Sequence, residues 1–348
     1  MADTNRTAEL KLLATKTLVV AAILILCWLA WQLRELLMLV FGAVLVSVVL
    51  RMIARPIHHR FGIGEGWSLG AAVLLVFGVL AMALWLFGAE VAQQTSNLAD
   101  LIPKAWASLQ GRLEQWGLSG QVERLMQGGT SSSVLSNVSG LVMSVGSGLT
   151  DLVLVIFGGI YVAAQPGLYR KGLLKLIPAG KRPLMDETLH DSGRALQLWL
   201  KGRLVSMTFV AILTGVGLTI IGVPSALTLA LLAGLLEFIP FIGPILSAVP
   251  AVLLALASSP TSALWVALLF LIIQQLEGNL IEPLVQQRAV ELPPALLLFA
   301  IVAATLVFGT IGILLGAPLL VVVYVMVKRL YVREALGTDT PIPGEEAA

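Results

Sequence analysis

One carboxylate stands in the most apolar part of the chain. Glu237 follows L-A-L-L-A-G-L-L, and Pro240, Gly243 and Pro244 come shortly after it. Proline removes a backbone donor and glycine permits unusual dihedral angles, so these residues predict a break in the apolar run. Backbone broken at membrane depth must be buried in protein or line an aqueous cavity. Glu237 is therefore a candidate ion, proton or substrate site, with a capping or interhelical hydrogen bond as the structural alternative.

A second polar set lies in the sequence Q-Q-L-E-G-N-L-I-E at 274–282. Gln275, Asn279 and Glu282 share one helical face by their spacing of four and three residues, while Glu277 points elsewhere. Carboxylate and amide oxygens are ligands for a hard cation such as Na⁺. The alternative for this set is a polar helix end at the cytoplasmic interface.

Three further residues are weaker candidates for a transport site, and two observations argue against other kinds of site. Asp151 lies in an apolar stretch, where a packing salt bridge or an interface position is as good an explanation as function. Gly309 and Gly312 interrupt the apolar block Ala295–Val327. The histidines lie in basic loops without ligand spacing, so no metal site is certain. Phosphate-binding and hydrolase motifs are absent, so we expect neither an enzyme nor a cofactor.

The composition identifies the elements that must position these residues. Hydrophobic residues make up 58% of the chain and charged residues 12%, with a mean hydropathy of +0.94. Soluble domains carry about 25% charged residues, so we predict an all-α, polytopic membrane protein. The net charge of +2, without a block of like charge, argues against a nucleic-acid partner.

About eight membrane segments are predicted from the apolar runs, with a tight turn at Arg34-Glu35 between the first two. We divide the chain into five parts. These are three spans in 1–90, an external amphipathic segment in 91–136, the fourth span with a basic cytoplasmic bridge in 137–203, a transport region in 204–333 and a disordered tail in 334–348.

The basic residues predict the orientation. With a cytoplasmic N-terminus, eighteen of the 22 Lys and Arg residues lie inside and four outside. Both termini are then cytoplasmic, and an odd number of crossings separates Gly222 from Lys328. Blocks 226–256 and 295–327 satisfy this count as broken re-entrant hairpins from opposite faces, an arrangement found in secondary transporters. Kinked, tilted spans are the alternative for both blocks.

Three ordered motifs resemble a known family. They are L-L-E-F-I-P-F-I-G-P-I-L at 235–246, E-G-N-L-I-E-P-L-V-Q at 277–286 and V-F-G-T-I-G-I-L-L-G-A-P-L at 307–319. The chain resembles the autoinducer-2 exporter family of PerM-like permeases over nearly its whole length. It departs from the family pattern at Gln287, where a glycine is usual, and at Leu292-Pro293-Pro294, where L-H-P is usual.

The resemblance implies a homo-oligomeric secondary transporter of the bacterial inner membrane. We expect it to export a small polar solute, such as an autoinducer-2-like signalling molecule or a related metabolite, with ion or proton coupling. The resemblance equally allows a Na⁺(Li⁺)/H⁺ antiporter. A membrane scaffold without transport activity is the third hypothesis. The expected partners are the solute or ion, the lipid bilayer and further copies of the chain.

Overall fold

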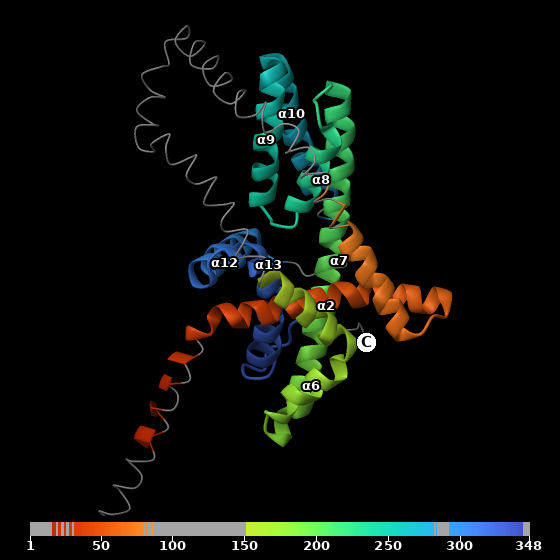
Figure 1. Cartoon of the computed structure of the whole chain (residues 1–348). Coiled ribbons are helices and arrows are strands. Elements are labelled where there is room, and N and C mark those ends of the chain that lie inside the picture. Colours follow the sequence, from red (N-terminus) through yellow and green to blue (C-terminus); the bar gives the residue numbers. More distant parts are fainter. Residues whose placement is uncertain are drawn as a thin grey trace, which may run out of the picture.

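The structure is a computed structural model that describes most of the chain outside one long internal segment. The described residues are 16–18, 20–21, 24–25, 28–29, 31–79, 81–82, 85, 151–281, 283 and 292–343. Over these residues the fold is helical and contains no strand, which confirms the predicted all-α class (Figure 1). Three predicted features lie outside the described residues. They are the external amphipathic segment, residues 137–150 at the start of the predicted fourth span, and Glu282.

The N-terminal helices differ in one respect from the expected hairpin. Helix α2 spans Arg34–Phe61 and ends at Gly62, whose φ of +64° suits glycine. The amides of Leu33 and Leu37 donate to the carbonyls of Leu29 and Leu33, so helical spacing continues through the turn that we predicted at Arg34-Glu35. His58 and His59, assigned to a loop from the sequence, lie in the last turn of α2.

Three α-helices follow α2 among the described residues before the long helix of the molecule. The helix Glu65–Val79 is apolar, and the helix Asp151–Ala164 is bent by 90° against α6, Pro166–Lys175. Pro166 stands at the first position of α6, where a missing amide is tolerated. A short 3-10 helix, Ala179–Lys181, leads into the next element.

Helix α7, Arg182–Ile221, connects the two halves of the described fold. It has 40 residues, about 60 Å at 1.5 Å per residue, and ends at Gly222 with a φ of +80°. The sequence assigned its first half to a cytoplasmic bridge and its second half to a separate span, whereas the structure makes them one helix. In Figure 1 its upper half lies with α8, α9 and α10, and α2 crosses it lower down.

The upper bundle contains α7, α8 (Ala226–Leu236), α9 (Ile242–Ser258) and α10 (Pro260–Leu276). Its core is built from buried aliphatic residues and Phe270. Small residues bring α8 against α7: a Cβ added to Gly234 would lie 2.7 Å from the Cβ of Ala211 and 2.9 Å from the carbonyl oxygen of Met207. This close approach fixes the distance between the two helices.

The second apolar region of the C-terminal half, after the upper bundle, contains α12 (Pro294–Phe308) and α13 (Thr310–Met326). Between the two regions, α10 continues as the π-helix η2 (Glu277–Ile281), and after α13 the π-helix η3 (Val327–Arg333) follows. Both predicted interruptions are present. The first break falls at 237–241, earlier than predicted, because Gly243 and Pro244 already belong to the first turn of α9.

The segment after Arg333 differs from the disorder predicted for the tail. Lys328 Nζ donates to the carbonyl oxygen of Pro341 at 3.1 Å, and Arg333 Nη2 donates to that of Thr340 at 2.8 Å. Ile342 is buried in a cluster with Ala195 of α7 and Val321 and Val325 of α13. One apolar side chain and two basic residues of η3 thus hold residues 334–343 against the helices.

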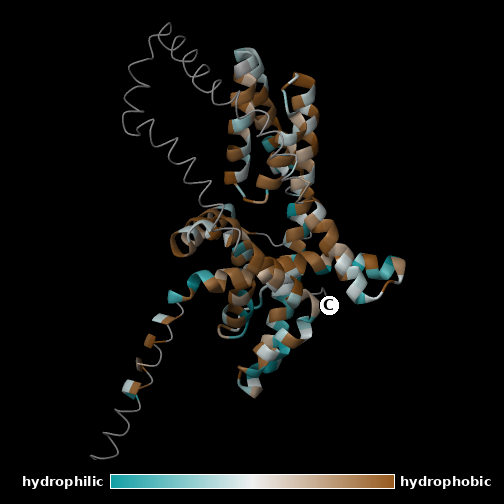
Figure 2. Cartoon of the chain, viewed as in Figure 1, coloured by the Kyte–Doolittle hydropathy of each residue, from teal (hydrophilic) through white to brown (hydrophobic). Residues whose placement is uncertain are grey.

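Large apolar side chains remain exposed on the outside of the helices, and hydrophobic residues colour most of the helical ribbon in Figure 2. Leu74, Ile220, Leu264, Phe299 and Leu306 are among the most exposed. Soluble monomers rarely expose such continuous apolar surface. Four helices in the described part are long and apolar enough to cross a membrane, or five if the bent pair at Gln165 counts as one. The chain is therefore a polytopic helical membrane protein.

Candidate functional site

The break after α8 contains a buried ion cluster. Glu237 caps the C-terminal end of α8, and its exposed fraction is 2%. Arg203 of α7 reaches it: Nη2 of Arg203 donates to Oε1 of Glu237 at 2.9 Å. Nη1 of the same guanidinium lies 3.6 Å from Oε1 of Glu277, at the end of α10. Three helices thus contribute one charged side chain each to a single cluster.

Local helix geometry explains why the cluster needs an arginine. The C-terminal end of a helix carries a partial negative charge, so a carboxylate there is unfavourable by itself. Glu237 occupies this position in α8. The guanidinium of Arg203 compensates both charges, because its Nε also donates to the carbonyl oxygen of Phe238 at 3.4 Å. The contact of Gly234 with α7 brings the two helices close enough for Arg203 to reach across.

The side chain of Glu277 is held by a residue of its own helix. Nε2 of Gln274 donates to Oε2 of Glu277 at 2.8 Å, which leaves Oε1 facing Arg203. Glu277 also begins the π-helix η2. Single π-helical turns inside α-helices often occur at functional sites, because the extra residue redirects the side chains around it. The irregular turn therefore belongs to the same site as the ion cluster.

One oxygen of the cluster has no partner within the part of the chain that the structure describes. Oε2 of Glu237 is buried, and it forms no hydrogen bond with any residue that the structure describes. A buried acceptor without a partner costs about 1–3 kcal/mol. The two carboxylates outnumber the one guanidinium, so the cluster has an excess negative charge. Oε2 of Glu237 can accordingly take a proton, a cation or a hydrogen-bond donor from a polar solute.

Both broken regions of the C-terminal half approach the middle of α7. One hydrophobic cluster combines Met38 and Leu45 of α2 with Leu196 and Leu200 of α7. Packed against it are Phe238 from the first break and Phe308 and Ile311 from either side of the second. Phe238 meets Trp199 of α7 edge-to-face at 6.0 Å between ring centroids. The ion cluster therefore adjoins an apolar layer to which both breaks contribute.

Two glycines make these breaks tight. A Cβ on Gly243 would lie 2.0 Å from the carbonyl oxygen of Leu236, and one on Gly312 would lie 2.1 Å from that of Ala304. No side chain fits at either distance, so each glycine lets a helix start pack on the end of the preceding helix. Gly309 itself has a φ of +69°, which favours glycine. Pro240 is buried in the turn between α8 and α9.

The remaining predicted residues lie differently from Glu237 and Glu277. Gln275 and Asn279 are both exposed, and Nδ2 of Asn279 donates to the carbonyl oxygen of Gln275. The polar face predicted for η2 therefore points away from the cluster, whereas Glu277 points into it. Asp151 is half-buried, and its side chain forms no hydrogen bond or ion pair with another described residue. Glu282 lies outside the described residues.

The sequence-based search missed Arg203. Its basic side chain was counted with the cytoplasmic loop residues, because L-W-L-K-G-R was interpreted as the approach to a span. The signal was the apolar sequence on both sides: Leu198 and Leu200 precede Arg203, and Leu204 and Val205 follow it. A charge in the middle of one apolar helix requires a partner, and this chain provides two.

Known proteins resemble this chain over most of its length. Residues 18–331 match the family described as AI-2E family transporter. A candidate transport protein of Mycobacterium tuberculosis is 30% identical over 298 residues, which cover 81% of this chain and 78% of that protein. The candidate transport protein YueF of Bacillus subtilis is 27% identical over 84% of this chain and 83% of its own length. The AI-2 transport protein TqsA of Escherichia coli is 23% identical over 88% and 89%.

Proposed function

The chain belongs to the AI-2E transporter family, and from this premise we propose that it is an ion- or proton-coupled exporter of a small polar solute. The observation that carries the coupling site is the buried Oε2 of Glu237, which has no partner among the described residues while Oε1 is paired with Arg203. The name of TqsA supports an autoinducer-2-like solute or a related metabolite. The bacterial inner membrane is the proposed location, with both termini in the cytoplasm.

The mechanism follows from the charge balance of the cluster. With both carboxylates ionised, Arg203 attracts Glu237 and Glu277 together and holds the turn after α8 against α7. A proton on Glu237 removes one of the two negative charges and weakens the pair with Arg203. The turn that carries Glu237 and Phe238 is then free to move relative to α7. Binding or release of the proton thereby changes access to the site.

The two broken regions are the moving elements in this proposal. Helix α8 has 11 residues and α12 has 15, about 16 and 22 Å at 1.5 Å per residue. Neither spans the hydrocarbon core of about 30 Å. We propose that 226–256 and 295–327 enter the membrane from opposite faces, so that their breaks meet near its middle. The shared hydrophobic cluster around Leu196 and Leu200 supports this placement.

The charges also bear on the cation/proton antiporter. The guanidinium of Arg203 lies between the carboxylates of Glu237 and Glu277 and repels a metal ion at that position. Within the described ranges, no group of three or more His, Cys, Asp or Glu side chains could hold a metal. A proton is therefore the coupling ion that this cluster favours. The family resemblance adds the expectation of a homo-oligomer.

Reconstituted transport tests the proposal. Wild type, Glu237→Gln and the exposed control Glu35→Gln are compared in proteoliposomes, with a panel of small polar solutes and imposed proton or Na⁺ gradients. We expect Glu237→Gln to remain folded and to lose proton-driven flux, because glutamine has nearly the same shape and cannot ionise. Glu35→Gln should behave as wild type.

Three outcomes of this experiment would contradict a part of the proposal, namely the coupling residue, the coupling ion or the transport function. Equal flux of wild type and Glu237→Gln across the whole pH range would remove Glu237 from the mechanism. Flux driven by Na⁺ alone, and lost in Glu237→Gln, would replace the proton by a metal ion and favour the antiporter. Absence of any solute flux in wild type, with intact folding, would favour the scaffold.

A further inference from the structure

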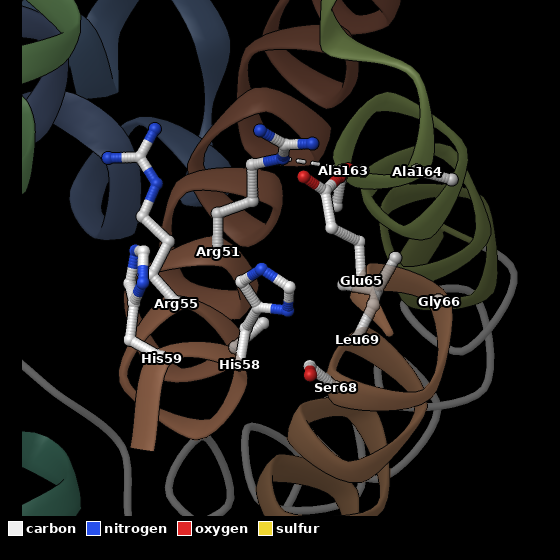
Figure 3. A pocket seen from close by; sticks show the side chains of 11 residues that line it. Arg51, Arg55, His58, His59, Glu65, Gly66, Ser68, Leu69, Ala163 and Ala164 are labelled. Carbon is white, nitrogen blue, oxygen red and sulfur yellow. Dashed lines mark hydrogen bonds between the residues drawn. The ribbon is translucent and has the colours of Figure 1, made fainter. Parts of the chain in front are cut away.

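A second charged site lies at the end of α2, where the bundle is hollowed. A cavity of about 360 Å³ opens between the last turns of α2, the start of the helix Glu65–Val79 and the end of the helix Asp151–Ala164. All five of the charged or imidazole side chains Arg51, Arg55, His58, His59 and Glu65 line the cavity. In Figure 3, Arg51 and His58 lie toward Glu65, whereas Arg55 and His59 project to the other side of the same helix. None of these side chains takes part in the proposed coupling site.

Helical spacing places the basic residues together. Arg51, Arg55 and His58 follow one another by four and three residues, so their backbone positions lie on the same side of α2. Nε of Arg51 donates to the carbonyl oxygen of Ala163 at 2.8 Å, which fixes its guanidinium at the cavity. The two Nη groups form no hydrogen bond or ion pair with any other residue in the part of the chain that the structure describes.

The histidines are oriented by their neighbours. Nδ1 of His58 lies 2.6 Å from the carbonyl oxygen of Ile63, a distance at which the ring nitrogen donates. His58 and His59 contact each other edge-to-face at 5.3 Å between ring centroids. Ser68, in the first turn of the next helix, donates to the carbonyls of Ile63 and Gly64. The turn after α2 therefore holds both imidazoles beside the two arginines.

From this arrangement we propose that the cavity binds a phosphate group. Two guanidinium groups and one carboxylate line the cavity, so it has a net positive charge even with neutral imidazoles. Arginine binds phosphate through two parallel N–H···O bonds, and the Nη groups of Arg51 are available for this geometry. Glu65 lies where it can accept a hydrogen bond from a hydroxyl group attached to the phosphate. Leu69 and Ala163 form the apolar part of the wall.

The surroundings of the cavity favour a phospholipid as the source of the phosphate. Trp67 is 80% exposed beside the cavity, and Phe61 and Leu74 are also strongly exposed. Exposed tryptophan is typical of the membrane–water interface, and apolar side chains beyond it can contact acyl chains. Basic pockets between membrane helices on the cytoplasmic side bind anionic headgroups. This last step rests on the proposed orientation, whereas the phosphate site does not.

The test measures lipid binding and leaves transport aside. Full-length protein in detergent is titrated with phosphatidylglycerol, with phosphatidylcholine of the same acyl chains, or with inorganic phosphate at constant ionic strength. Bound lipid is counted by native mass spectrometry. We expect phosphatidylglycerol to bind more tightly than phosphatidylcholine. Loss of one charge-assisted contact in Arg55→Gln should weaken that binding roughly tenfold.

A matched control lies on the same helix. Arg60 belongs to the last turn of α2 and is exposed, but it does not line the cavity. Arg60→Gln should change the affinity for phosphatidylglycerol less than about twofold, as expected for a screened surface charge. The side chain of Arg55 forms no hydrogen bond or ion pair with another described residue, so Arg55→Gln leaves the bond of Arg51 to Ala163 intact and preserves the fold.

The outcomes separate the two sources of phosphate. Tight binding of inorganic phosphate that depends on Arg55, without preference for phosphatidylglycerol, would support the phosphate site and assign it to a free anion. Equal losses in Arg55→Gln and Arg60→Gln would overturn the proposal, because they indicate a general surface attraction. Failure of both phosphatidylglycerol and inorganic phosphate to bind wild type would also overturn it. None of these results depends on Glu237.

Discussion

The two broken regions of the C-terminal half have similar backbones and different chemistry. In α8–α9 and in α12–α13, a glycine presses against a carbonyl of the preceding helix, and one residue in the break has a positive φ. Only the first region carries a charge in its break. Helices α12 and α13 contain no ionisable group other than Tyr324. The comparison teaches that the shape of such a break and the chemistry beside it are set independently.

The difference also divides the proposed roles. Glu237 ties the first break to α7 through Arg203, so a change of protonation acts there. The second break contacts the layer around α2 and α7 with Phe308 and Ile311, which respond to packing alone. We therefore assign coupling to the first region and passive closure to the second.

Removal of Arg203 should have the largest effect. Arg203→Met leaves two buried carboxylates without their common cation, and breaking a buried ion pair from one side costs about 3–5 kcal/mol. We expect a loss of that size in the free energy of unfolding and no transport, measured by thermal unfolding in detergent and by flux. Restored stability in the double variant Arg203→Met/Glu237→Gln would identify Glu237 as the carboxylate whose buried charge requires the guanidinium. An unchanged unfolding temperature in the single variant would refute the buried cluster.

The two glycines should respond alike, which is the sharpest test of the common backbone. In Gly243→Ala and Gly312→Ala the new methyl group meets a carbonyl oxygen at about 2 Å. Overpacking of this kind costs about 1–3 kcal/mol, and more where backbone has to move. Comparable destabilisation in both variants is expected from thermal unfolding, with Gly278→Ala as a control at an open position. A clear loss of stability in only one of the two variants would show that the two breaks do not share the same tight backbone packing.

Glu277 should matter less than Glu237 for stability. Its carboxylate is 3.6 Å from Arg203, and Gln274 still provides a hydrogen bond to a glutamine at this position. We expect Glu277→Gln to destabilise the protein by about 1 kcal/mol, the usual value of one intramolecular contact, and to reduce flux without abolishing it. Complete loss of flux with normal unfolding would make Glu277 an equal partner in coupling.

The smallest effect is expected at the tail, which packs on the uncharged second region. Ile342→Ser removes the apolar contact with Val321 and Val325. Because the tail can detach as a unit, the free energy of unfolding of the helices should change by less than about 0.5 kcal/mol. Limited proteolysis should instead cut residues after Gly337 several times faster than in wild type. A large shift of the main unfolding transition would show that the tail supports α13 directly.

Sequence patterns within a few residues predicted the helix breaks better than they predicted how neighbouring helical segments are connected. The breaks near Glu237 and Gly309 were predictable because proline and glycine act on the backbone within a few residues. The continuity of α7 was not, since a change from polar to apolar composition near Lys201 resembles a boundary while the hydrogen bonds simply continue. The docking of Ile342 was missed for a related reason. A single apolar residue in a polar tail gives no periodic pattern.

The sequence by itself determined that the chain is a helical membrane protein, where its apolar blocks break, and that Glu237 is out of place in an apolar environment. These properties depend on composition and on interactions within one or two helical turns. Only the tertiary structure decided that Arg203 is the partner of Glu237, 34 residues away, and that Glu277 faces the same guanidinium. That pairing depends on how closely α8 packs on α7, which Gly234 and Ala211 set together across two helices.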